Sequence, residues 1–104
     1  MTVRVAGIGS ALPEKIVTND DLAQHMDTSD AWIRERSGIG ARRVGGSTVD
    51  MAIDAATLAI KDADLVPDDI GLLILCTTTP EKTFPASSAK VAAGLGITCG
   101  AMDL

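Results

Sequence analysis

A periodic segment followed by a short apolar run constrains the fold of this chain more than any other feature. Between Ser47 and Asp64, polar side chains recur at alternating steps of four and three residues, as on the solvent-facing side of a helix: Asp50, Asp54, Thr57, Lys61 and Asp64. The run from Ile70 to Cys76 is apolar, as expected of a strand that is buried on both faces of a parallel sheet. A helix that leads into such a strand predicts a layered α/β fold.

The other segments fit the same architecture. We expect strands at residues 3–9, 41–44 and 100–104, with loops at 12–15 and 77–85. Helices are predicted from a cap at Thr18 or Asn19 to about Met26, from a cap at Thr28 or Ser29 to Gly38, and over 86–95. Because no crossover follows the last strand, the chain is expected to stop in the middle of this architecture.

Composition limits what such a fold can do. The 104 residues fit one domain at most, and the core is aliphatic because Trp32 and Phe84 are the only aromatic residues. The net charge of −5 argues against nucleic acid as a partner.

The cysteines and the apolar runs indicate where the protein resides. Cys76 and Cys99 have the spacing of neither a metal site nor a disulfide framework, and Cys76 is expected to be a buried, inert thiol. No apolar run is long enough to cross a bilayer, and the first residues do not resemble a signal peptide. We therefore predict a cytoplasmic protein that does not insert into a membrane.

The segment Asp27–Gly38 carries the clearest candidate binding residues. At helical spacing, Thr28, Trp32 and Arg36 lie one turn apart on one face. A hydroxyl, an indole and a guanidinium in a row suit a ligand that has an aromatic ring and phosphates. From these residues alone, the competing interpretation is an exposed Trp32 that Arg36 covers as a surface cation–π pair.

Other motifs do not indicate chemistry. Gly7-Ile8-Gly9 lacks the third small residue of a dinucleotide fingerprint, since that position holds Leu12. We expect these glycines to permit a close backbone approach instead. His25 is expected to be an ordinary, partly exposed side chain. No metal motif is present, and nothing supplies a nucleophile with its base.

Taken together, these stretches resemble the N-terminal part of ketoacyl-acyl-carrier-protein synthase III, the condensing enzyme that starts bacterial fatty acid synthesis. The order and spacing of the matching motifs hold over essentially the entire chain. They are Gly7-Ile8-Gly9-Ser10, Leu12-Pro13-Glu14, Thr18-Asn19, Asp21-Leu22, Asp27-Thr28-Ser29-Asp30, Trp32-Ile33, Arg36, Gly38-Ile39, Ala55-Ala56, Ile70-Gly71-Leu72, Thr77-Thr78, Phe84-Pro85 and Asp103-Leu104.

The resemblance implies a thiolase-like fold, with a mixed, mostly parallel sheet flanked by helices, of which residues 1–104 form only the N-terminal portion. It also implies a homodimer. The family reaction is a decarboxylating Claisen condensation of acyl-CoA with malonyl-acyl carrier protein. In it, a cysteine thiolate takes the acyl group before the malonyl-derived carbanion attacks. Coenzyme A then enters as part of a substrate, and no cofactor is implied.

The resemblance also assigns roles to individual residues. Trp32 is implied to stack on the adenine of coenzyme A, while Thr28 and Arg36 contact the nucleotide and its phosphates. Ser37 stands where the family usually has threonine and keeps the hydroxyl for a ligand contact. Phe84 is implied to reach across the dimer into the partner's acyl pocket.

The basic cluster around Arg36 lies, by the same resemblance, near where an acidic carrier protein would approach. Its members are Arg34, Arg36, Arg42 and Arg43. A solvated basic face is the alternative interpretation.

No catalytic residue of the family is matched in this chain. Neither Cys76 nor Cys99 corresponds to the family's nucleophile, and His25 does not correspond to its catalytic histidine. The 104 residues are therefore expected to be inactive by themselves. The alternatives are a non-catalytic module that binds coenzyme A or forms a dimer surface, a hydroxymethylglutaryl-CoA synthase, and a secondary-metabolite acyltransferase of the same fold.

Overall fold

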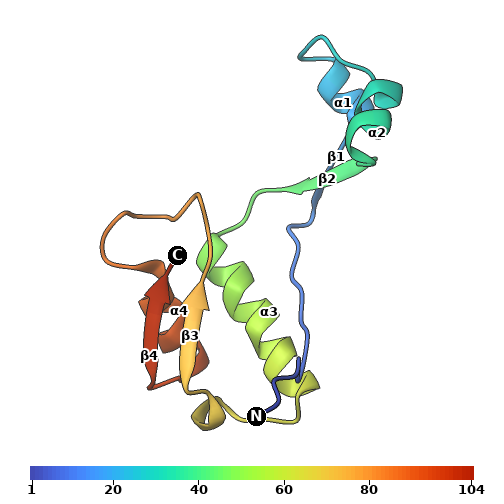
Figure 1. Ribbon diagram of the computed structural model, residues 1–104. Coiled ribbons are helices and arrows are strands. Elements are labelled where there is room, and N and C mark those ends of the chain that lie inside the picture. The colour runs from blue at the N-terminus through green and yellow to red at the C-terminus, as the bar shows by residue number, and fades with distance from the viewer. The chain divides into compact units, whose positions relative to one another are not determined.

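The structure is a computed structural model that describes residues 1–104. It divides into two compact units, one formed by residues 1–11 and 46–104 and the other by residues 12–45. Figure 1 labels their helices and strands.

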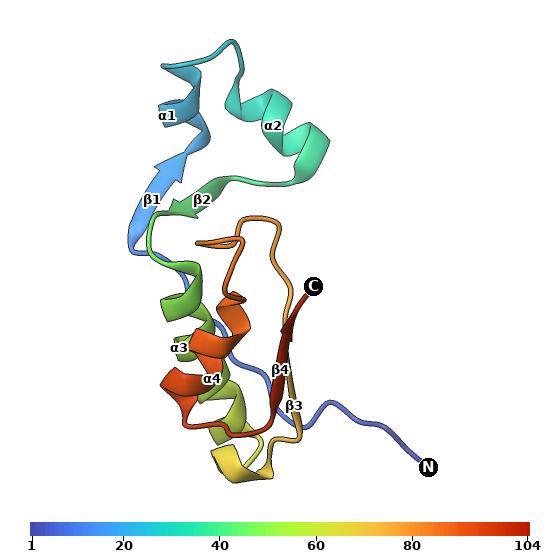
Figure 2. The ribbon, with the colours of Figure 1, turned by 90° about the vertical axis from the view of Figure 1, so that its left-hand side faces the viewer.

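The smaller unit is a strand pair that encloses two short helices. Strands β1 (Lys15–Thr18) and β2 (Ala41–Val44) pair antiparallel, with Lys15 opposite Val44. Between them lie α1 (Asn19–Ala23) and α2 (Asp30–Ser37), which contact each other (Figure 2). The two helices are therefore held at the end of a short hairpin-like ladder.

Both helices of this unit begin where capping residues predict. The Thr18 hydroxyl accepts from the Asp21 backbone N–H at 3.1 Å, and the Asp21 carboxylate accepts from the Thr18 N–H at 2.8 Å. Ser29 caps α2 by accepting from the Trp32 N–H at 3.2 Å. Gly38, with φ +73°, ends α2 in the left-handed conformation that glycine adopts without strain.

The larger unit is built on helix α3 (Thr48–Asp62), which Ser47 caps. Four of the five side chains of the predicted solvent-facing side lie on α3 and are exposed, so the periodicity is confirmed; the fifth, Asp64, is exposed just after the helix ends. A 3₁₀ turn, η1 (Pro67–Asp69), leads to β3 (Leu72–Leu75), and α4 (Ser87–Leu95) precedes β4 (Gly100–Asp103). The two strands pair in parallel, with Leu72 opposite Gly100.

Helix α4 is the centre of this unit because it contacts α3 and both strands (Figure 2). The buried apolar side chains lie on α3 and on α4 and the residues just after it: Val49, Val91, Ala92 and Ile97. One face of the β3–β4 pair is thereby covered by α4.

The predicted strand at residues 3–9 is wrong. This segment pairs with no strand and instead lies along α3, where the Ile8 N–H donates to the Asp62 carboxylate at 3.0 Å (Figure 1). A β-carbon at Gly7 would collide with the Ala59 carbonyl oxygen, and one at Gly9 with that of Ala55. The expected close backbone approach therefore exists, but to a helix. The segment does not form a strand because none of the strands pairs with it.

The strands form two pairs, one antiparallel and one parallel, so the expected mixture of strand directions is confirmed for the part of the fold that these residues form. Two other expectations are corrected. β3 is covered on one face only, since Leu72 and Ile74 are 55% and 49% exposed. Cys76 is also exposed, because it continues the alternation of Leu72 and Ile74 on the uncovered face. Strand β1 starts within the predicted loop, and its last residue, Thr18, is also the cap of α1, so the sequence pattern indicates only the helix.

Candidate functional site

Helix α2 presents the tryptophan to solvent. Trp32 is 55% exposed, and the Arg36 guanidinium carbon lies 5.4 Å from the centroid of its ring. The indole and the cation are thus adjacent, as the spacing of four residues predicts. This contact fits both the ligand-binding interpretation and the surface cation–π pair.

Thr28 also lies beside the indole of Trp32, although it belongs to the loop before α2. It lies before the cap Ser29, so the prediction that it occupies a helical turn below Trp32 is wrong. The loop nevertheless brings it beside the indole, because Asp27, Thr28, Ser29 and Trp32 line one shallow pocket. The pocket combines hydroxyl groups with an aromatic ring, while Asp27 adds a carboxylate that would not favour an anionic group.

The arginines of the basic cluster differ in their partners. Arg34 pairs with Asp30 at 2.9 Å, and Arg42 donates to the Asn19 side-chain oxygen at 3.4 Å. Arg43 donates to the Pro13 carbonyl at 3.1 Å. Arg36 contacts the indole face but makes no hydrogen bond or ion pair in this structure. Its donors therefore remain free for a phosphate group.

Ser37 uses its hydroxyl within the chain. The group donates to the Ile33 carbonyl at 2.8 Å and accepts from the Ile39 N–H at 3.2 Å. Since a hydroxyl has one donor and two acceptor positions, a ligand contact from Ser37 would have to use its remaining lone pair.

A buried asparagine holds α2 in place. Asn19 is fully buried, and its amide group donates to the Asp30 carboxylate at 2.9 Å and to the Ile39 carbonyl at 2.7 Å. These bonds connect both ends of α2, the helix that carries Trp32 and is called the tryptophan helix below, to α1. The same bond from Asn19, followed by that from Arg34, lowers the pKa of Asp30. From the sequence, Asn19 is a possible helix cap and part of the Thr18-Asn19 motif; no local pattern indicates that its side chain is buried or that it holds α2.

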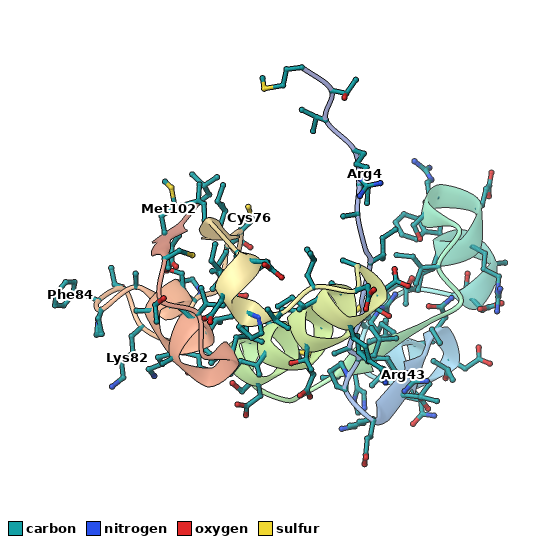
Figure 3. All side chains as sticks on the ribbon, turned by 90° about the horizontal axis from the view of Figure 1, so that it is seen from below. Arg4, Arg43, Cys76, Lys82, Phe84 and Met102 are labelled. Carbon is teal, nitrogen blue, oxygen red and sulfur yellow. The ribbon has the colours of Figure 1, made fainter.

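Phe84 lies in the larger unit, on the loop between β3 and α4. Its side chain is 87% exposed and points away from the rest of that unit (Figure 3). The site residues predicted from the resemblance are therefore divided between the two units: Thr28, Trp32, Arg36 and Ser37 in the smaller one and Phe84 in the larger one.

The remaining candidates for chemistry are dispersed. Cys76 is exposed, and Cys99 donates through its sulfur to the Gly100 carbonyl at 3.4 Å. His25 is exposed at the end of α1. No three side chains of His, Cys, Asp or Glu converge on a point that could hold a metal ion. None of the helices has the length and apolar character needed to span a membrane.

Comparison with solved structures defines the class of fold. The chain is similar to 3-oxoacyl-[acyl-carrier-protein] synthase III from Aquifex aeolicus, with a TM-score of 0.91 and 39% identity over 97% of the chain. It is also similar to the priming β-ketosynthase of the R1128 polyketide pathway, with a TM-score of 0.89 and 30% identity over 97% of the chain. The present chain covers 34% of the first solved chain and 31% of the second. The fold is that of part of a thiolase-like condensing enzyme.

Comparison with curated sequences identifies the particular relatives. The chain is 52% identical to β-ketoacyl-[acyl-carrier-protein] synthase III of Rhizorhabdus wittichii over 96% of its length, and 46% identical to that of Rickettsia massiliae over 94%. No protein-family model matches it. The predicted resemblance to synthase III is thereby confirmed, for a chain that spans about a third of the length of these relatives.

Proposed function

We propose that this chain is part of a β-ketoacyl-acyl-carrier-protein synthase III. The complete protein is an acyltransferase that condenses acyl-CoA with malonyl-acyl carrier protein, with loss of carbon dioxide, and so initiates fatty acid synthesis. The observation that carries this proposal is the 52% identity to such a synthase along nearly the whole chain. Because no nucleophile of the family lies within these residues, the 104-residue chain alone is inactive.

The tryptophan helix is the proposed acyl-CoA site. In this proposal Trp32 stacks on the adenine, Arg36 binds phosphate through its free donors, and Thr28 contacts the nucleotide from the pocket beside the indole. Ser37 supplies at most one further contact, and Phe84 belongs to the acyl pocket of a homodimer partner. The exposure of Trp32 and the absence of any intrachain partner for Arg36, other than the indole, support this assignment.

The test is a condensation assay on the protein as its gene encodes it. Acetyl-CoA and malonyl-acyl carrier protein are supplied, and acetoacetyl-acyl carrier protein, carbon dioxide and free coenzyme A are measured. The proposal predicts all three products in equal amounts. A purified, folded protein that binds acyl-CoA but forms no condensation product would contradict it.

A second candidate is a priming synthase of secondary metabolism. The likeness to the R1128 polyketide priming β-ketosynthase favours this alternative. The two differ in the carrier protein they serve, so the same assay with a fatty-acid and a polyketide carrier protein separates them.

A third candidate is a non-catalytic module that binds coenzyme A or forms a dimer surface. The mass of the natural gene product decides it. A native protein that ends at Leu104 supports the module and excludes the synthase.

A further inference from the structure

The loop that carries Phe84 is fastened at both ends. At its start, the Thr77 N–H donates to the Leu104 carbonyl at 3.2 Å, which extends the β3–β4 pairing. At its end, the Asp103 carboxylate accepts from the backbone N–H groups of Ser87 and Ser88 at 2.9 and 2.8 Å. Residues 77–86 therefore leave and re-enter the folded unit at fixed points.

Glu81 fastens the same loop in the middle. One of its carboxylate oxygens accepts a hydrogen bond from the Ser47 hydroxyl, and the other lies 3.6 Å from the Lys90 ammonium nitrogen. Ser47 is the cap of α3, and Lys90 lies on α4. Glu81 thus bridges two helices to the loop. The Ser47 hydroxyl, the Val49 backbone N–H and Lys90 all lower the pKa of Glu81, in that order, so it binds there as a carboxylate.

Phe84 contrasts with this anchored backbone. It follows Glu81 by three residues, yet its ring is almost fully exposed, and the neighbouring Lys82 also points outward (Figure 3). A large apolar side chain that is displayed from a fastened loop loses little conformational freedom when it binds. The loop is therefore suited to place this ring at a defined position.

We propose that Glu81 is a positioning residue, which fixes loop 77–86 by joining it to Ser47 and Lys90 and so sets where Phe84 meets the acyl chain of the substrate. This inference rests on the proposed function, in which Phe84 lines an acyl pocket. It adds a residue that touches neither substrate nor nucleophile but influences which acyl chains are accepted.

A matched pair of variants at Ser47 tests this role. Asp and Asn are comparable helix caps, so both preserve the start of α3. In Ser47→Asn the amide group still donates to Glu81, whereas in Ser47→Asp a second carboxylate repels it. Two quantities are compared in the protein as its gene encodes it: the ratio of kcat/KM for acetyl-CoA to that for hexanoyl-CoA, and amide hydrogen exchange in residues 77–86.

We expect Ser47→Asn to keep the wild-type ratio and exchange rates. Ser47→Asp should shift the ratio by roughly tenfold, the lower end of the scale for loss of one charge-assisted hydrogen bond, and accelerate exchange in the loop by about tenfold. Equal ratios in the two variants would overturn the proposal, as would equal loop exchange. Glu81→Gln should give the same direction of change as Ser47→Asp.

The proposed function and the role of Glu81 can fail separately. If the wild-type protein forms no condensation product, the proposed function fails. Hydrogen exchange in the two Ser47 variants then still decides whether Glu81 holds the loop, because that measurement requires no activity.

Discussion

At the residue scale, Arg36 is distinguished by what its guanidinium does not contact. Its three basic neighbours are held by a carboxylate, an amide oxygen and a backbone carbonyl, whereas Arg36 has only the indole face of Trp32. A guanidinium that lies on the face of an aromatic ring keeps the N–H groups in its own plane available to a ligand. This difference makes Arg36 the best candidate of the four for a phosphate ligand.

Asn19 yields the first prediction, at the same scale. Replacing it with Ala leaves the Asp30 carboxylate and the Ile39 carbonyl without their buried donor. We expect the smaller unit to lose about 1–3 kcal/mol of stability. Since Trp32 is the only tryptophan, its fluorescence during denaturant unfolding reports on this unit. Asp20→Ala, at the exposed next position of α1, is the control, and equal midpoints for the two variants would contradict the prediction.

At this scale, the sequence predicts a contact between two residues when both lie within one helix, and not when the contact depends on how separate segments fold together. The adjacency of Trp32 and Arg36 follows from helical spacing alone, and the sequence was sufficient to predict it. The burial of Asn19 depends on how α2 folds back on α1, which no local pattern specifies. Thr28 lines the same pocket as Trp32 because of a loop conformation, and not because it lies one helical turn before Trp32, as predicted.

At the element scale, the fit of the N-terminal segment against α3 depends on the absence of side chains. Gly9→Ala would place a methyl group against the Ala55 carbonyl, which is backbone and cannot move aside. We predict a loss of about 1–3 kcal/mol, typical of overpacking. Gly71→Ala is the matched control, because a β-carbon there has nothing within 4 Å. Thermal melts of the two variants that coincide would refute this packing argument.

Asp103 makes the stability of the larger unit depend on pH. The backbone N–H and side chain of Ser88, and the N–H of Ser87, lower the pKa of Asp103 below its ordinary value of 3.8. A lowered folded-state pKa means that the contact stabilises the fold above about pH 4 and is lost as the pH falls further. We therefore expect the stability advantage of wild type over Asp103→Asn to shrink between about pH 5 and pH 2. Thermal melts across this range measure the difference, and a constant difference would contradict a stabilising role for the hydrogen bonds that Asp103 accepts.

The elements themselves show what sequence patterns can specify. Helices α2, α3 and α4 were predicted because each has caps or periodicity within its own residues. Strands were predicted less well, since a strand exists only with a partner. Residues 3–9 have the composition of a strand but none of the strands pairs with them, and β3 has the composition of a fully buried strand but only one covered face.

At the scale of the whole molecule, the β3–β4 pair leaves apolar side chains uncovered. Leu72, Ile74, Met102 and Leu104 are all exposed, on and just beyond two strands whose other face α4 covers. Exposed apolar surface next to unpaired strand edges favours association. We predict that the 104-residue chain by itself binds a hydrophobic dye and self-associates in sedimentation. A cooperative melt of a monomer without dye binding would contradict this prediction.

The most direct test of nucleotide recognition by the tryptophan helix compares two substrates that differ only in the nucleotide. The kcat/KM for acetyl-CoA and for acetyl-pantetheine, which lacks adenine and the 3′-phosphate, is determined for wild type and for Trp32→Ala. We predict that the substitution lowers the value for acetyl-CoA by the equivalent of about 1–2 kcal/mol of lost stacking and leaves the value for acetyl-pantetheine unchanged. Equal effects on the two substrates, or no effect on either, would contradict nucleotide recognition by the tryptophan helix.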